Sequence, residues 1–307
     1  MLSLFFAAKL ESAMRILKYA VITLLLFLVL LVIVLASGCV IWRSPAYYTE
    51  YPAIPLKKSI MTPEEYGAVV EAHARPYIVR HEAGTSAVLL FGAEHTRDPK
   101  HPQLDQLRNE WKKFRPTVAL VEGRLGFLFR WFMDPVVHLG EGGLVYDLAK
   151  SDGIDTYSWD PPLEKEVAWV QQEFPPYRVA LFYVLRPYFG AFRQGPVDDP
   201  ESFVEEYRVQ RTAYAGLENT LPSIAAIDSI WRKEFAGLKD WRETTDEYGW
   251  PGYLNDIAKR SNSFRDEHFA RVILDLVKKG HRVFAVAGSS HAVKLDSTLA
   301  LSINEGQ

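Results

Sequence analysis

Cysteine is nearly missing from this chain, since Cys39 is the only one among 307 residues. A single cysteine excludes an intramolecular disulfide framework and any zinc site built from several cysteines. The sequence also contains neither a GxSxG nor an HExxH motif, so it offers no standard serine-hydrolase or zinc-protease signature. Any metal would therefore have to be bound by histidine and carboxylate side chains.

The chain also lacks an excess of charge of either sign. It has 35 Lys and Arg against 38 Asp and Glu, a net charge of −3, and its basic residues form no block. Without such a block there is no surface to neutralise phosphates, so we expect no nucleic-acid partner. Hydrophobic residues make up 48% of the chain, which is typical of a folded protein with a substantial core.

One long stretch lacks charge altogether. The run from Tyr19 to Trp42 has no charged residue, and a helix of roughly 20 apolar residues is enough to span a bilayer. Lys9, Arg15 and Lys18 precede it, so the positive-inside rule leaves the N-terminus in the cytoplasm. We therefore expect a bacterial cell-membrane protein with its globular part on the outer side, periplasmic or extracellular.

The end of this run allows two kinds of tether. Leu35-Ala36-Ser37-Gly38-Cys39 is similar to a bacterial lipoprotein signal, in which the cysteine is lipidated and becomes the new N-terminus. Alternatively the apolar run, which is longer than an ordinary signal core, stays uncleaved as an anchor. The sequence from Met14 onward reads as a more typical signal than the longer N-terminus does, so Met14 is a second candidate start.

Periodicity predicts an α/β fold with a central, largely parallel or mixed sheet flanked by helices. Short apolar runs predict buried strands at 87–91, 118–121 and 283–287, and one-sided apolar patterns predict helices over 104–114 and 264–277. We expect a signal or anchor over 1–42, a proline-containing linker and lead-in over 43–80, and one domain over 81–307. Within that domain we expect a helical insert over about 163–240, broken at Pro187, Pro196 and Pro222, and an irregular loop over 240–253.

Three of the predicted strands end in residues that can do chemistry. Gly92-x-x-His95 follows the first, Glu122-Gly123-Arg124 the second, and Gly288-x-x-His291 the last. Ligands of open α/β sheets bind beyond the carboxyl ends of the strands, so these segments can meet in one crevice. Two imidazoles and a carboxylate, from His95, His291 and Glu122, suit a divalent metal such as Mn, Co, Zn or Fe.

Each of these residues also has a structural interpretation. His95 and His291 can be hydrogen-bonded histidines at strand ends. Glu122 can form an ion pair with Arg124 or Arg265.

Other residues near the strand ends are weaker candidates. Glu94 and Asp98 share the loop of His95 and are candidate partners that orient its ring. Asp160 follows another predicted strand and either lines the crevice or serves the turn before Pro161-Pro162.

These segments resemble those of a known group. Gly92-x-x-His95, the VALVEGR segment ending at Arg124, Arg265 and the terminal FAVAGSSH are similar to the TraB/PrgY, GumN and Tiki group, which is related to erythromycin-esterase-like and ChaN-like proteins. The resemblance covers roughly residues 85–295. It implies that His95, Glu122 and His291 form the active site, and that the chain acts like the membrane-tethered, metal-dependent Tiki proteases. The Ala93-Glu94 pair departs from the group, which commonly has a Thr-containing sequence there.

Three functions remain open from the sequence. The first is a membrane-anchored, metal-dependent hydrolase of a peptide or small-molecule substrate, in which Glu122 ligates the metal or acts as general base and Arg124 or Arg265 stabilises the oxyanion. The second is a metal-free, esterase-like hydrolase with His95 as general base. The third is a non-catalytic protein that binds a peptide, haem or a metal.

The charge flanking the apolar run predicts the topology. A reporter enzyme that works only outside the cytoplasm, fused after Gln307, should be active, because all three upstream basic residues lie on the same side of the run. A second fusion to a reporter that works only in the cytoplasm should be silent. Signal from the cytoplasmic reporter alone would contradict the predicted orientation.

Overall fold

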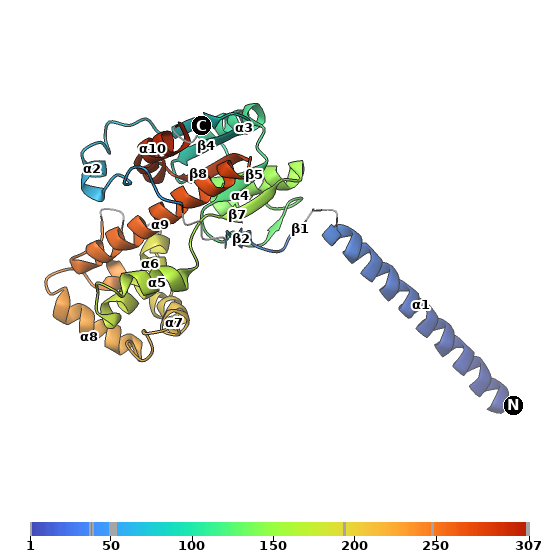
Figure 1. Ribbon diagram of the computed structural model, residues 1–307. Coiled ribbons are helices and arrows are strands. Elements are labelled where there is room, and N and C mark those ends of the chain that lie inside the picture. Colours follow the sequence, from blue (N-terminus) through green and yellow to red (C-terminus); the bar gives the residue numbers. More distant parts are fainter. Residues whose placement is uncertain are drawn as a thin grey trace.

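The structure is a computed structural model that describes residues 2–36, 38, 40–48, 54–192, 195–246 and 249–304, without the side chains of 2–13 and 304. It is a mixed α/β protein with a mostly parallel central sheet flanked by helices and a long apolar helix at the N-terminus (Figure 1). The sequence-based prediction of an α/β fold with such a sheet is confirmed.

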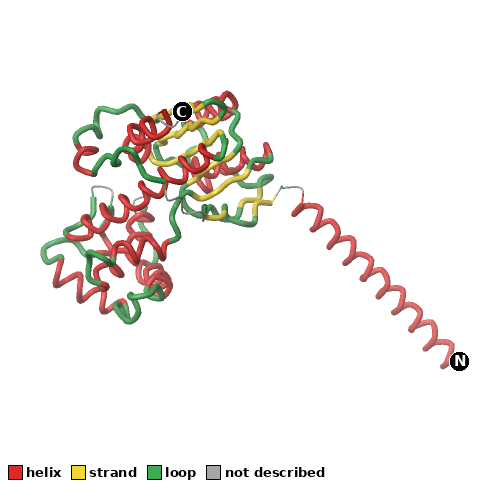
Figure 2. The backbone as a smooth tube through the Cα atoms, viewed as in Figure 1, coloured by secondary structure: helices red, strands yellow, loops and turns green. Residues whose placement is uncertain are grey.

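The central sheet has six strands, of which five run parallel. Figure 2 shows the strands in yellow with red helices around them. Along the sheet they are β2 (Ala46–Tyr47), β7 (Asp155–Ser158), β5 (Val118–Val121), β8 (Arg282–Gly288), β4 (Ser86–Ala93) and β3 (Tyr77–Ala83). Only β3 is antiparallel to its neighbour, β4. A separate antiparallel pair joins β1 (Val40–Ile41) to β6 (Leu128–Phe129).

Helices cover both faces of the sheet. Val88 and Leu90 of β4 belong to a core shared with α9 (Tyr253–Lys278) and α10 (Ser289–Asn304). Leu89 and Phe91 belong to a second core, shared with α3 (Pro102–Phe114) and α4 (Pro135–Asp152). Alternate residues of one strand thus serve opposite cores, which is why β4 reads as an uninterrupted apolar run and is buried throughout.

A third core lies in a lobe of helices between β7 and α9. Four helices, the 3₁₀-helix η1 (Trp241–Glu243) and the first turns of α9 enclose it, with Leu254 and Ile257 as part of its wall. Figure 1 shows α9 running from this lobe onto the sheet. The helices are α5 (Leu163–Val170), α6 (Pro176–Phe192), α7 (Pro200–Arg211) and α8 (Ile224–Glu234).

Several boundaries differ from the sequence-based ones. The segment 43–80, expected as a linker and lead-in, supplies β2, the short helix α2 (Pro63–Gly67) and the start of β3. Pro187 does not end the helix, because the buried residues around it keep α6 helical. Helix α9 begins at Tyr253, directly after the expected loop, and α10, which the sequence did not predict, begins directly after β8.

The N-terminal helix α1 (Leu2–Ala36) contains a stretch, Met14–Ala36, that is long and apolar enough to cross a membrane. Its 23 residues are not buried against the rest of the protein. Cys39, the expected lipid attachment site, lies outside the described residues.

The tight packing at Gly92 can be tested by adding a methyl group. A Cβ there would lie 2.6 Å from the Ala292 Cβ and 2.8 Å from the Tyr77 carbonyl oxygen. We expect Gly92→Ala to lower the free energy of unfolding by about 1–3 kcal/mol, the usual cost of overpacking. Gly67→Ala is the matched control, since a Cβ there meets nothing within 4 Å. Urea unfolding of both variants measures the difference, and equal stability would contradict the packing.

Candidate active site

The carboxyl ends of four neighbouring strands supply the candidate site. His95 follows β4, Glu122 follows β5, and Asp160 lies two residues beyond β7. His291 lies in the first turn of α10, which begins directly after β8. Because β7, β5, β8 and β4 are consecutive and parallel in the sheet, their carboxyl ends share one edge.

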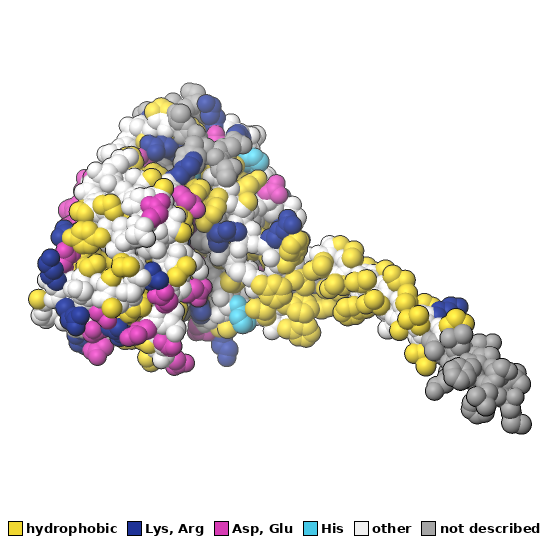
Figure 3. All heavy atoms as spheres, turned by 90° about the horizontal axis from the view of Figure 1, so that it is seen from below, with side chains coloured by type: hydrophobic (Ala, Val, Ile, Leu, Met, Phe, Trp, Pro, Cys, Tyr) yellow, Lys and Arg dark blue, Asp and Glu magenta, His cyan; other side chains and the backbone are white. Residues whose placement is uncertain are grey.

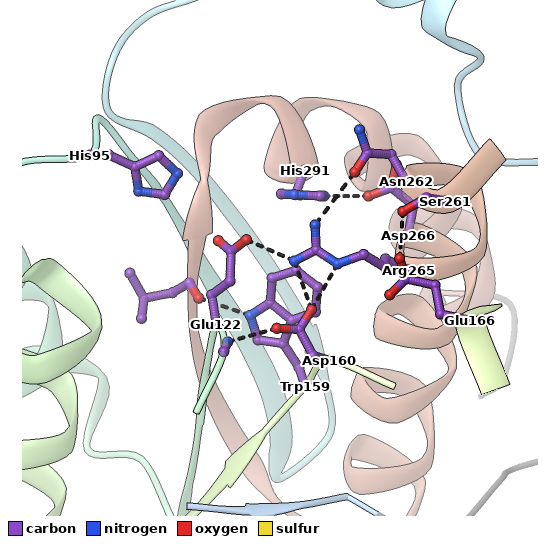
Figure 4. A network of polar contacts seen from close by, with 12 residues as sticks. His95, Glu122, Trp159, Asp160, Glu166, Ser261, Asn262, Arg265, Asp266 and His291 are labelled. Carbon is purple, nitrogen blue, oxygen red and sulfur yellow. Dashed lines mark hydrogen bonds and ion pairs between the residues drawn. The ribbon is translucent and has the colours of Figure 1, made fainter. Parts of the chain in front are cut away.

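At this edge His95, Glu122 and His291 come together beside Gly288. A Cβ on Gly288 would lie 3.0 Å from His95 Nε2 and 3.9 Å from His291 Cδ2, so both rings lie within 4 Å of one point. Figure 4 shows the two imidazoles on either side of the Glu122 carboxylate. The glycine of the second GxxH segment therefore leaves room for the histidine of the first.

The His95 ring is oriented by a carboxylate from α4. Its Nδ1 lies 2.6 Å from Glu141 Oε1, and the other oxygen of Glu141 accepts a hydrogen bond from the backbone N–H of Thr96. A carboxylate at Nδ1 favours the tautomer with the proton on that nitrogen. The Nε2 atom is thereby turned toward Gly288, and the ring is 62% exposed.

The His291 ring is held in the same way, but in the interior. Its Nδ1 forms a hydrogen bond with a carboxylate oxygen of Asp266 on α9. The other oxygen of Asp266 accepts a hydrogen bond from Lys294 at 3.2 Å. Trp159 packs edge to face against the ring with centroids 5.2 Å apart. Burial acts to raise the pKa of Asp266, but the neighbouring His291 and Lys294 outweigh it, so this pKa lies below its usual range.

The third component is a buried ion network around Arg265. Its Nη2 lies 2.8 Å from Glu122 Oε1 and 2.7 Å from Asp160 Oδ1. The second oxygen of Asp160 accepts a hydrogen bond from the Gly123 N–H at 2.7 Å. A buried guanidinium is stable only when paired, and here one cation joins two strand ends (Figure 4).

The network keeps Glu122 ionised. Burial acts to raise the pKa of this carboxyl group, but the charge of Arg265 and, to a smaller extent, those of His291 and His95 lower it to about 2. Its Oε2 atom is buried and accepts no hydrogen bond from any residue that the structure describes. Glu122 therefore offers one oxygen to Arg265 and retains a negatively charged oxygen for another partner.

Two cavities adjoin this edge of the sheet. One of about 810 Å³ is lined by His95, Glu122 and Glu141, and a second of about 690 Å³ is lined by Asp160 and Arg265. Arg124, whose side chain is exposed, and Gly190 line both cavities, so the two cavities are neighbours. His291 is buried and is not among the residues lining either one.

The structure shows the contacts of three of the candidate residues. Glu122 pairs with Arg265, whereas the Arg124 guanidinium stacks over the Tyr47 ring, 5.5 Å from its centroid. Asp160 lines the second cavity.

Glu94 and Asp98, the candidate partners of His95, contact other residues. Glu94 comes within 3.7 Å of His101, and Asp98 accepts a hydrogen bond from the Lys100 N–H. The carboxylate that contacts His95 Nδ1 is Glu141 of α4.

Neither of the carboxylates that hold the imidazoles was predicted from the sequence. Glu141 lies in a glycine-containing turn of α4 with no spacing relation to His95, so no local signal marked it. Asp266 could have been noticed, because it follows Arg265 directly on the last long helix.

Within the described parts of the chain, no three His, Cys, Asp or Glu side chains are grouped in a way that would hold a metal ion. Comparisons of the chain with family models, curated proteins and solved structures found no match.

The low pKa of Glu122 predicts how stability changes with pH. Because the pKa falls from its ordinary 4.5 to about 2 on folding, ionised Glu122 stabilises the fold above pH 4.5, and this contribution is lost as the pH falls toward 2. Glu122→Gln removes it. The free energy of unfolding of the native chain minus that of the variant should therefore decrease between pH 4.5 and 2, as urea unfolding can measure. A difference independent of pH would contradict the ion pair.

Proposed function

We propose that this chain is a membrane-tethered, exported hydrolase that acts on a peptide or ester bond. The observation that carries the proposal is the meeting of His95, Glu122 and His291, from three strand ends, beside a cavity of about 810 Å³. The resemblance of their motifs to the TraB/PrgY, GumN and Tiki group supports the same chemistry. The apolar helix α1 supports the tether, whether it stays as an anchor or is replaced by a lipid on Cys39.

The histidines are suited to move protons. A carboxylate on Nδ1 fixes the proton on that nitrogen and leaves Nε2 as the atom that accepts a proton from water. His95 is the exposed one and lines the cavity, so it is the general base in this proposal. Arg124 is exposed on the same lining and is a cation that can stabilise a developing oxyanion, while Arg265 positions Glu122.

A divalent metal fits this donor set by chemistry. His95, His291 and Glu122 would hold it, and Glu122 has a charged, buried oxygen that accepts no hydrogen bond from the described residues. The carboxylates behind both imidazoles match the outer shell that usually orients metal-bound histidines. Bound Mn, Co, Zn or Fe would polarise the carbonyl and lower the pKa of water.

The metal-free, esterase-like mechanism is the second candidate. It is favoured by the ion pair that occupies Glu122 Oε1 and by the lack of a three-ligand group among the described residues. In it His95, oriented by Glu141, removes the proton from water without help from a metal.

The helical lobe closes one side of the site. Tyr183 and Arg186 of α6 and Arg211 of α7 line the second cavity opposite Asp160 and Arg265. We propose that this lobe is an insert into the α/β domain and that it confines the substrate next to the catalytic edge.

Replacing His95 tests the proposal. His95→Ala should abolish turnover of a peptide and ester panel by the purified full chain, and the variant should stay folded because the ring is exposed and its loss leaves no cavity in the core. His281→Ala is the matched control, since His281 precedes β8 at the opposite end of the strand. Elemental analysis of the same samples separates the two mechanisms.

About one metal ion per chain, lost in His95→Ala and kept in His281→Ala, is expected for the metal-dependent mechanism. Turnover without metal would favour the metal-free one. If the native chain shows no turnover, or if His95→Ala turns over like the control, the hydrolase proposal is wrong.

A further inference from the structure

Exposed aromatic side chains gather around the small β1–β6 pair. Trp42 directly follows β1 and is 56% exposed, while Phe127, Trp131 and Phe132 flank β6 and are 55%, 64% and 78% exposed. Phe129 of β6 contacts the rings of Trp131 and Phe132, with centroids 5.9 and 4.9 Å apart. We call Trp42, Phe127, Trp131 and Phe132 the aromatic edge. Clustered apolar exposure of this kind marks an interaction surface.

Chain connectivity places this edge next to the end of the apolar helix. The span ends at Ala36, and β1 begins four residues later at Val40, which pairs with Phe129. Four residues reach at most about 14 Å when fully extended. The edge therefore stays close to the end of the span, whatever direction α1 takes.

The length of the span sets the depth of this edge. At 1.5 Å per residue, the 23 residues Met14–Ala36 extend about 35 Å, slightly more than the roughly 30 Å of a bilayer's hydrocarbon core. Ala36 then lies near the outer boundary of the core, and the edge lies at the headgroups. Interfacial tryptophan is typical of this depth. Arg43, whose guanidinium lies 4.1 Å from the Trp42 ring centroid, is exposed and suited to lipid phosphates.

We propose that the aromatic edge inserts into the headgroup region of the bilayer that α1 crosses. Figure 3 shows hydrophobic side chains continuing from the long helix onto the adjoining surface of the globular body. The aromatic edge is also close in sequence to the cavity of Glu122, since Leu125 and His138, which come before Phe127 and after Phe132 in the chain, line that cavity. The cavity is thereby placed beside the membrane surface. This inference rests on the proposed tether and not on the hydrolase chemistry.

Spin labels on the full chain test the insertion. In a Cys39→Ser background reconstituted into phospholipid vesicles, nitroxides are attached at Trp131→Cys or Phe132→Cys. The matched control is Leu238→Cys, an exposed apolar position 55% accessible in the helical lobe. Collision with oxygen, which enters the bilayer, is compared with collision with a water-soluble nickel chelate. We expect the oxygen-to-nickel ratio to be several-fold higher at 131 and 132 than at 238.

Each other result overturns the proposal. Labels at 131 and 132 that meet nickel as readily as the label at 238 are in water. Labels shielded from both reagents are covered by protein, either a second copy or another chain. Flotation of the labelled chain with the vesicles reports the tether separately: if it floats and the labels are in water, only the insertion fails. If it does not float, the tether and the insertion fail together, and the hydrolase chemistry is unaffected.

Discussion

The guanidinium of Arg265 joins two strand ends that would otherwise repel each other. Glu122 follows β5 and Asp160 follows β7, and both carboxylates contact this one cation. Because a buried charge without its partner costs about 3–5 kcal/mol, removing Arg265 would force the two loops apart or neutralise Glu122. The position and the negative charge of Glu122 therefore both depend on one side chain of α9.

The next residue of α9 serves the other half of the site. Asp266 holds His291, so neighbouring residues of one helix fix two of the three central groups. His95 is fixed from the opposite face of the sheet by Glu141 of α4. The two imidazoles are thus oriented by helices on different sides of the sheet, and a side chain on Gly288 would crowd the His95 ring.

Periodicity was enough to place the central strands, because β4, β5 and β8 are buried on both faces and read as apolar runs. It missed α10, which begins directly after β8 with no loop between the two elements. The parallel order of the strands then explains why the motif residues His95, Glu122 and His291 share one edge. Glu141 and Asp266 could not be paired with the histidines from sequence, because such pairs depend on how α4 and α9 pack.

The proposed hydrolase requires His95 and His291 to act in one centre. A double-mutant cycle on the hydrolysis rate tests this requirement, with His95→Ala, His291→Ala and both together in the full chain. Residues that act as a unit are strongly non-additive. We expect the double variant to lose no more activity than either single variant. Losses in rate that multiply would show two independent roles and would contradict a single centre.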